Sequence, residues 1–202
     1  MAYCISILMG YLLGCSNMAF YICKAKKVDL RQHGSANLGA SNATIVLGWR
    51  AGILTGIHDI AKGALAVILA RLLFPNAVHI GAVAGVACVL GHIFPFYLKF
   101  RGGKGFASYL GMLLALDWKF ALVMMVLILI VTLIFDYIVI GTVSVIFAGP
   151  VYFGIASQSF MMPLILLAAS AVILYKHREN FPRILNGTEK GLRSILKKQD
   201  RV

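Results

Sequence analysis

Residues 91–108 read Gly-His-Ile-Phe-Pro-Phe-Tyr-Leu-Lys-Phe-Arg-Gly-Gly-Lys-Gly-Phe-Ala-Ser, and they join the end of one apolar segment to the start of the next. Their cations and glycines are Lys99, Arg101 and Lys104, and Gly102, Gly103 and Gly105. Glycine lets backbone N–H groups face a ligand, and such groups beside lysine and arginine at a helix start form an anion site. We expect a phosphate there. The alternative is a glycine-rich cytoplasmic loop without a ligand.

The composition is that of a helical membrane protein. The chain has 202 residues, of which 60% are hydrophobic and 13% charged, and its mean hydropathy is +0.88. Long uncharged apolar runs of this kind are typical of membrane-spanning helices. The net charge of +12 comes from basic residues concentrated in a few loops, which argues against a nucleic-acid surface. No carboxylate or thiol cluster suggests a metal, and we expect no cofactor.

Seven apolar spans are predicted, at about residues 2–23, 51–73, 79–98, 105–117, 119–135, 138–156 and 160–176. Crossing ~30 Å of hydrocarbon takes about 20 helical residues. Apart from Lys62, Arg71 and Lys119, every lysine and arginine falls on the loops or tail that would face one side. By the positive-inside rule that side is the cytoplasm. The sequence therefore predicts an all-α integral membrane protein with seven transmembrane helices, its N-terminus outside and its C-terminus cytoplasmic, forming a single membrane domain over residues 1–202.

The second span carries two opposite charges, Asp59 and Lys62, three residues apart on one helical face. A charge inside a membrane segment costs about 2.5–3.5 kcal/mol on insertion scales, so such residues face each other or a polar interior. We expect a structural ion pair that supports the site, and one wall of the site itself is the alternative. His58 points in another direction and is expected to be packed. The small residues Gly10 and Gly14 of the first span predict close helix packing.

Two further polar clusters lie on the predicted cytoplasmic face. Residues 33–42, His-Gly-Ser-Ala-Asn-Leu-Gly-Ala-Ser-Asn, form a small polar loop that offers hydroxyl, amide and backbone donors, unless it is a plain linker. Residues 176–189 present several cations and His177, which can donate to a phosphate or transfer a proton. Here the alternative is a basic collar at the lipid headgroups, and we expect such a collar for the tail, residues 191–202.

Together the three clusters resemble the motifs of the bacterial membrane acyltransferases that acylate glycerol 3-phosphate with acyl-phosphate, the PlsY family. Gly34–Asn42 is similar to the first motif, His92–Gly105 to the second and Lys176–Glu189 to the third, and Asp59–Gly63 fits the family's second helix. The resemblance covers nearly the whole chain in the family's order. It implies a seven-helix enzyme of the bacterial cytoplasmic membrane, with its active site at the cytoplasmic face, that makes lysophosphatidic acid and phosphate in the first step of phospholipid synthesis. The implied partners are acyl-phosphate, glycerol 3-phosphate, the lipid bilayer and, functionally, a soluble acyl-ACP:phosphate transacylase, but no nucleic acid.

The resemblance also implies roles for individual residues. The suggested catalytic residues are Ser35, Lys104, His177 and Asn180. The suggested substrate-binding residues are Asn37, Gly39, Asn42, Arg50, His92, Arg101, Gly102, Gly103, Gly105, Lys176, Arg178 and Arg183. No metal site is implied. The chain departs from the family at Ile45, where an arginine usually serves the glycerol-phosphate site, and at Asp136-Tyr-Ile-Val, where the family has Arg-Tyr-Val-Ser. Arg50 and Arg183 are the candidates to supply the missing cation.

An acyl-phosphate is a mixed anhydride, already activated towards a hydroxyl group. The protein must therefore hold two phosphates close together and neutralise the departing one, with no acyl-enzyme. The chain has neither a His-x4-Asp pair nor a Gly-x-Ser-x-Gly elbow. The base for the attacking hydroxyl is left open between a substrate phosphate oxygen and His177. The alternative functions are a membrane transporter or other anion-handling protein, which would need polar residues on both faces, and a divergent or inactive family member with another acceptor.

Overall fold

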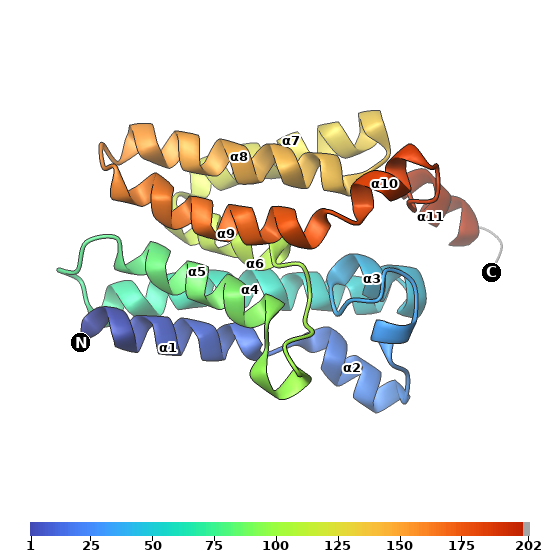
Figure 1. Cartoon of the computed structure of the whole chain (residues 1–202), viewed down its shortest axis with the longest axis horizontal. Coiled ribbons are helices and arrows are strands. Elements are labelled where there is room, and N and C mark those ends of the chain that lie inside the picture. The colour runs from blue at the N-terminus through green and yellow to red at the C-terminus, as the bar shows by residue number, and fades with distance from the viewer. Residues whose placement is uncertain (200–202) are drawn as a thin grey trace. The chain divides into compact units, whose positions relative to one another are not determined.

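The computed structural model describes residues 1–199, and its regular elements over that range are all helical (Figure 1). They are α1 (Ala2–Cys15), α2 (Met18–Lys26), η1 (Leu30–Gln32), α3 (Ala40–Leu47), α4 (Trp49–Leu73), α5 (Ile80–Ile93), η2 (Phe96–Leu98), α6 (Phe106–Leu116), α7 (Trp118–Phe135), α8 (Ile138–Ala156), α9 (Met161–His177), α10 (Asn180–Leu185) and α11 (Leu192–Gln199). The chain forms two compact units, one ending at Trp118 and the other beginning at Lys119. Each is described by itself, and the single membrane domain stays a prediction.

Five helical segments are long and apolar enough to cross a membrane: Ala2–Lys26, Trp49–Leu73, Ile80–Leu98, Trp118–Phe135 and Ile138–Ala156. The other two predicted spans are shorter apolar helices, α6 with 11 residues and α9 with 17. At 1.5 Å per residue, α6 covers only about half of a ~30 Å hydrocarbon layer. The prediction of an all-α chain with membrane-spanning helices is confirmed, whereas a full crossing by each of the seven segments stays a prediction.

Small residues bring the helices of the first unit into backbone contact. Gly10 and Gly14 of α1 lie so close to α5 that a Cβ atom on either would overlap a carbonyl oxygen, that of Ala84 or Cys88. Gly111 of α6 approaches the backbone of α4 in the same way. Close approach through small residues is the usual basis of helix packing in membranes, where lipid provides no hydrophobic drive between helices. The predicted packing role of Gly10 and Gly14 is confirmed.

The first span is broken between α1 and α2, where the sequence predicted one helix over residues 2–23. α1 ends at Cys15, and the side chain of Asn17 caps α2 by accepting a backbone N–H bond. Two distant side chains satisfy carbonyls at the break: the Tyr97 hydroxyl donates to Cys15 O over 2.8 Å, and Lys62 Nζ donates to Ser16 O over 2.7 Å. Backbone groups at membrane depth must be satisfied within the protein, so the break depends on Tyr97 and Lys62.

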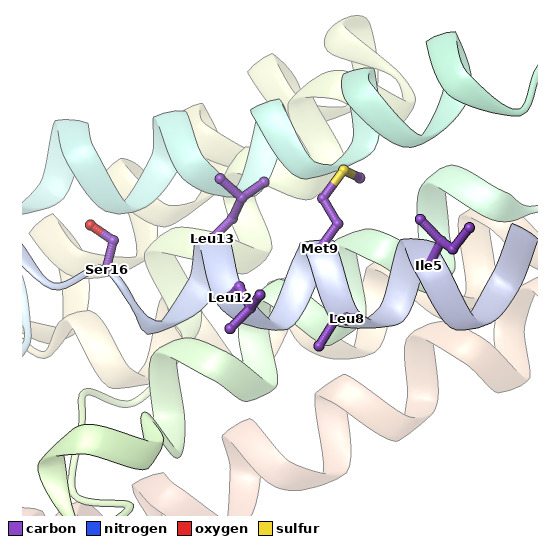
Figure 2. Close-up of a pocket in the computed structure, with 6 residues that line it drawn as sticks. All are labelled: Ile5, Leu8, Met9, Leu12, Leu13 and Ser16. Atoms are coloured by element: carbon purple, nitrogen blue, oxygen red, sulfur yellow. The ribbon is translucent and has the colours of Figure 1, made fainter.

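An open groove with a volume of about 530 Å³ runs along α1, and Figure 2 shows the residues that line it. It is lined by Ile5, Leu8, Met9, Leu12, Leu13 and Ser16. Apart from Ser16 at its end, the lining is apolar, as suits a surface in contact with hydrocarbon.

In the second unit α8 packs on α9, and the Ser170 hydroxyl donates to the Ile146 carbonyl over 2.7 Å. Asp136, one of the family departures, holds the C-terminal helix. Its backbone carbonyl accepts the N–H of Leu192 over 2.8 Å, and its carboxylate accepts the N–H of Arg193 over 2.7 Å. A carboxylate is favourable at the N-terminus of a helix, so Asp136 anchors α11. The basic collar predicted for residues 191–202 therefore includes a helix, and residues 200–202, with Arg201, lie outside the described residues.

Candidate active site

The glycine-rich loop between α5 and α6 folds back onto the end of α5. The Gly102 N–H donates to Ile93 O and the Gly103 N–H donates to His92 O, both over 3.1 Å. These two N–H groups are occupied, so the expectation that they face an anion is wrong. Glycine is needed here for close approach: a Cβ on Gly102 would overlap the His92 carbonyl, and one on Gly103 would overlap the His92 ring.

Donors for an anion lie slightly further along the chain, at the start of α6. Gly105 is the N-cap, with φ +91°, and it gives the helix no side-chain cap. The first N–H groups of a helix have no partner within the helix, and they lie at the positive end of its dipole. Lys104, half-buried, comes immediately before this N-cap. The start of α6 is therefore the anion-binding element of the second motif.

The first motif forms a compact turn that ends in a second helix start. The predicted loop over residues 33–42 is shorter than expected, because Gly39 is the N-cap of α3 and again provides no side-chain cap. The side chain of Asn42 is fully buried, and its two amide N–H groups share the carbonyls of Leu30, His33 and Asn37, which lie 2.9–3.0 Å from Nδ2. Its Oδ1 accepts the Ser35 N–H over 2.9 Å. The loop itself occupies this carboxamide, so Asn42 positions the loop.

Leu38 joins the two motifs. Its N–H donates to Gly102 O over 3.3 Å, and its carbonyl accepts the Asn17 amide over 3.1 Å. The starts of α3 and α6 are thus only a few residues along the chain from one shared hydrogen bond. This hydrogen bond brings the first and second motifs together within the first unit, whereas the gathering of all three motifs at the cytoplasmic face stays a prediction. Two helix N-termini without side-chain caps, held close together, suit the binding of two anionic groups.

Several candidate side chains around these helix starts have polar groups to offer. Ser35 Oγ accepts the Asn37 amide over 2.8 Å, which leaves the serine proton to donate elsewhere. Arg50, in the first turn of α4, and Arg101 are exposed, and within residues 1–199 neither makes a hydrogen bond or ion pair. Arg31 differs, because it pairs with Asp29 over 2.9 Å, and its hydrogen bonds hold the pKa of that carboxyl below the usual value.

A buried ion cluster contacts His92. Lys62 Nζ lies 2.7 Å from Asp59 Oδ1 and 2.8 Å from His92 Nδ1, and the side chains of Asp59 and Lys62 are only 1% and 5% exposed. The predicted ion pair is confirmed. His58 was expected to pack apart from it, but its Nδ1 lies 3.6 Å from Asp59 and its Nε2 lies 3.0 Å from Ser16 Oγ. His58 therefore belongs to the cluster.

The third motif lies in the second unit. His177, buried at the end of α9, donates from Nδ1 to the Ile173 carbonyl over 2.8 Å. In the neutral ring this leaves Nε2 as a proton acceptor. Asn180, also buried, donates to Glu189 Oε1 over 2.7 Å. Glu189 lies within the third motif but is not among the predicted site residues, and it is the acceptor that holds Asn180.

The cations of the third motif are held to different degrees. Arg183 donates to the carbonyl and carboxylate of Glu179 over 2.9 and 3.0 Å. The guanidinium of Arg178 lies over the Tyr175 ring, 3.9 Å from its centroid. Lys176 is half-buried in the last turn of α9. Arg183 thus donates to Glu179 from Nε and one Nη, and the other Nη of its guanidinium remains as a donor that could reach a phosphate.

The amino-acid sequence is similar to those of glycerol-3-phosphate acyltransferases. A family model described as glycerol-3-phosphate acyltransferase matches residues 4–187. Glycerol-3-phosphate acyltransferase of Coxiella burnetii (strain CbuG_Q212) is 40% identical over 191 residues, which cover 94% of this chain and 97% of the relative. Glycerol-3-phosphate acyltransferase 1 of Oceanobacillus iheyensis is 34% identical over 208 residues, covering 98% and 99% of the two chains.

Solved structures give the same result. The crystal structure of PlsY, an integral membrane glycerol 3-phosphate acyltransferase, in its glycerol 3-phosphate form is similar with a TM-score of 0.88 and 31% identity, covering 95% of this chain and 96% of that one. Its lysophosphatidic acid form gives a TM-score of 0.85 and 30% identity, covering 97% and 99%. The chain, with its motifs in the family's order and over nearly its whole length, therefore belongs to the glycerol-3-phosphate acyltransferase family.

Proposed function

We propose that this protein transfers a fatty acyl group from acyl-phosphate to the 1-hydroxyl of glycerol 3-phosphate, giving lysophosphatidic acid and phosphate. Family membership supports the reaction, and so do the glycerol 3-phosphate and lysophosphatidic acid forms of the structural relative. The observation that carries it is the pair of helix starts, α3 and α6, joined through Leu38 and Gly102. A reaction between two phosphate-bearing substrates needs such a pair.

In this reaction the hydroxyl oxygen attacks the carbonyl carbon of the mixed anhydride and loses its proton to a base. The bond from that carbon to the phosphate oxygen then breaks, and the phosphate leaves with the electron pair. Negative charge grows on the leaving phosphate, so a preorganised cation and helix dipole accelerate the step. We assign this role to Lys104 and the start of α6, with Arg101 close by in the loop.

The acceptor phosphate is assigned to the start of α3. Ile45, where the family usually has its glycerol-phosphate arginine, lies on α3. The next cation in the chain is Arg50, which has no ion pair with the residues that the structure describes. Ser35, whose hydroxyl proton remains to donate, is assigned to the reacting groups. His177 is assigned as the base, because Nε2 is its accepting nitrogen, and Asn180 with Glu189 orders that motif. Contacts from Lys176, Arg178 and Arg183 to phosphate stay predictions.

Turnover by the purified protein with palmitoyl-phosphate tests the function. With glycerol 3-phosphate we expect equal amounts of released phosphate and lysophosphatidic acid, and with His177→Ala a rate lower by about 10²–10⁴-fold, since general-base catalysis contributes that much. Other polyol phosphates are tested as acceptors in parallel, because Ile45 stands in place of the arginine that usually contacts the glycerol phosphate. Phosphate release without any acylated acceptor would contradict acyl transfer. A faster reaction with another polyol phosphate would show that glycerol 3-phosphate is not the preferred acceptor.

We also propose that seven helical spans cross the bacterial cytoplasmic membrane, with the N-terminus outside and both the C-terminus and the site on the cytoplasmic side. The concentration of lysine and arginine on one set of loops supports this orientation. Arg71 departs from the pattern, but its guanidinium donates to the Ala115 carbonyl over 2.8 Å, at the end of α6. Cations are favourable at a helix C-terminus, which gives Arg71 a structural reason for its place.

Labelling with an impermeant thiol reagent tests this topology. Single cysteines are placed on a background from which Cys4, Cys15, Cys23 and Cys88 have been removed. Asn76→Cys and Lys119→Cys are expected to react in intact cells, because both positions lie on predicted outside turns. Asn37→Cys and Gly187→Cys are expected to react only after permeabilisation. Labelling of Asn37→Cys or Gly187→Cys in intact cells would show that the proposed orientation or the number of spans is wrong.

The loop between α5 and α6 is proposed to be recessed into the membrane. α6 has 11 residues, which span about 16 Å, so it does not cross ~30 Å of hydrocarbon by itself, whereas Ile80–Leu98, with 19 residues, is long enough to do so. Irregular backbone at that depth is tolerated only where protein covers it or where it lines a watery cavity. The internal hydrogen bonds of Gly102 and Gly103 meet this requirement.

A further inference from the structure

The short segment after α10 is bonded back onto the third motif. The N–H groups of Thr188 and Glu189 both donate to the Arg183 carbonyl, over 2.8 and 3.1 Å. The carboxylate of Glu189 accepts the Asn180 amide over 2.7 Å. α10, which begins at Asn180, has only 6 residues, and an isolated helix of that length is not stable in water. The order of α10 therefore depends on its contacts with the segment that follows it.

The same segment is bonded at its other end to the turn between α7 and α8. The Leu192 N–H donates to the Asp136 carbonyl over 2.8 Å, and the Arg193 N–H donates to the Asp136 carboxylate over 2.7 Å. The Arg193 guanidinium donates to the Leu133 carbonyl over 3.0 Å. Gly191 is buried, and a Cβ atom on it would overlap Asp136 Oδ2. The turn and the segment thus fit together with no room for one more methyl group.

Very little chain separates these two sets of bonds. Only Lys190 and Gly191 lie between Glu189 and Leu192, and each residue has only two soft backbone dihedral angles. The point at which Leu192 is held therefore limits where the Glu189 carboxylate can lie. Without the bonds to Asp136, the contacts with α10 alone would have to offset the conformational entropy lost when the segment is ordered.

We propose that Asp136 is a positioning residue for the third motif: it holds residues 191–193, and through them it keeps the Glu189 carboxylate on Asn180. Asp136 acts only through this segment. That the segment thereby sets Asn180 and His177 for acyl transfer rests on the proposed function. The alternative role for Asp136 is to anchor α11 alone, which would leave the contact between Glu189 and Asn180 unaffected.

Two substitutions of Asp136 separate its side chain from its backbone. Asp136 has φ +69°, a conformation that glycine adopts without strain and asparagine tolerates. Asp136→Gly removes the acceptor for the Arg193 N–H, whereas Asp136→Asn keeps an oxygen acceptor there. Gly191→Ala disturbs the same contact from the other side. Gln158→Gly is the matched control, because Gln158 also has a positive φ, +49°, and lies in the turn between α8 and α9 of the same unit.

Hydrogen exchange of backbone amides, followed by NMR of the full chain in detergent, measures this tether directly. A hydrogen bond to a charged group is worth about ten- to a hundredfold in an equilibrium. In Asp136→Gly we expect the Thr188 and Glu189 amides to exchange faster by that factor, and in Gly191→Ala we expect the same. Asp136→Asn should keep most of the protection, and Gln158→Gly should keep all of it.

The alternative role gives a different exchange pattern. If Asp136 anchors α11 alone, faster exchange will be confined to residues 192–199. Unchanged exchange at Thr188 and Glu189 in either folded variant, Asp136→Gly or Gly191→Ala, would therefore overturn the proposal. Gly191→Ala carries the test if Asp136→Gly does not fold.

Turnover with palmitoyl-phosphate and glycerol 3-phosphate links the tether to the reaction. Because misplacing a catalytic group by a small distance is enough to slow a reaction, kcat of Asp136→Gly should fall by about ten- to a hundredfold. Neither KM should change much, since the third motif is assigned to the chemical step, and Asp136→Asn should recover most of the loss. An unchanged kcat in a variant whose Thr188 and Glu189 amides exchange faster would overturn the positioning role. Exchange needs no substrate, so a protein that shows the tether but acylates no acceptor would contradict the proposed function alone.

Discussion

Lys104→Ala is expected to lower kcat/KM for palmitoyl-phosphate by about 10²–10³-fold, the usual effect of removing one preorganised group from a developing negative charge. Lys104 directly precedes the N-cap of α6 and is half-buried, so its charge is less screened by water than that of an exposed lysine. The start of α6 remains in the variant, which is why some activity should persist. The measurement is turnover of purified protein together with its Tm.

Two further variants make the result specific. Lys104→Arg should recover only part of the loss, because a planar guanidinium differs in shape and hydration from a compact ammonium. Lys26→Ala removes the same charge from an exposed position on α2, so it should leave kcat/KM within a few-fold of the unsubstituted protein. If Lys104→Ala behaved like Lys26→Ala, residues 99–105 would be no more than a basic loop.

The helices were largely predictable, because the length of an apolar run is a strong signal for a membrane span. The break after Cys15 was not. Residues 2–23 carry no charge, and the local signal for the break is Asn17, a residue type preferred at helix N-caps. The groups that satisfy the broken backbone, Lys62 and Tyr97, lie 46 and 82 residues away along the chain. Those two tertiary contacts leave no local pattern in the sequence.

For some residues of the candidate site the sequence predicted a contact with substrate, whereas the structure shows their polar groups bonded within the protein. The spacing of Gly102 and Gly103 indicated free N–H groups, but both donate to the end of α5. Asn42 was expected to touch substrate, but its carboxamide is engaged by its own loop. A sequence shows which donors exist, and it does not show which of them are already bonded. For the same reason the anchoring of α11 by Asp136 could not be foreseen.

The Asp59 carboxylate is expected to be the most sensitive single group for the stability of the first unit. Asp59→Asn leaves the Lys62 ammonium buried without its counter-ion, and breaking a buried pair from one side typically costs about 3–5 kcal/mol. For a domain whose free energy of unfolding is about 5–15 kcal/mol, this is a large fraction. We expect a much lower Tm in detergent and a lower yield of folded protein.

Removing both charges distinguishes the stability of the pair from its role in the site. In Asp59→Asn/Lys62→Met no buried charge is left unpaired, and such neutral replacements are often tolerated. The double variant should recover most of the lost stability, though not all, because Ser16 O loses the Lys62 donor. Its turnover should stay low, because His92 of the second motif then loses its contacts with both Lys62 and Asp59 at Nδ1. A double variant as unstable as Asp59→Asn would show that the unpaired charge is not the cause of the loss. A double variant that is both stable and fully active would show that the cluster serves the fold alone.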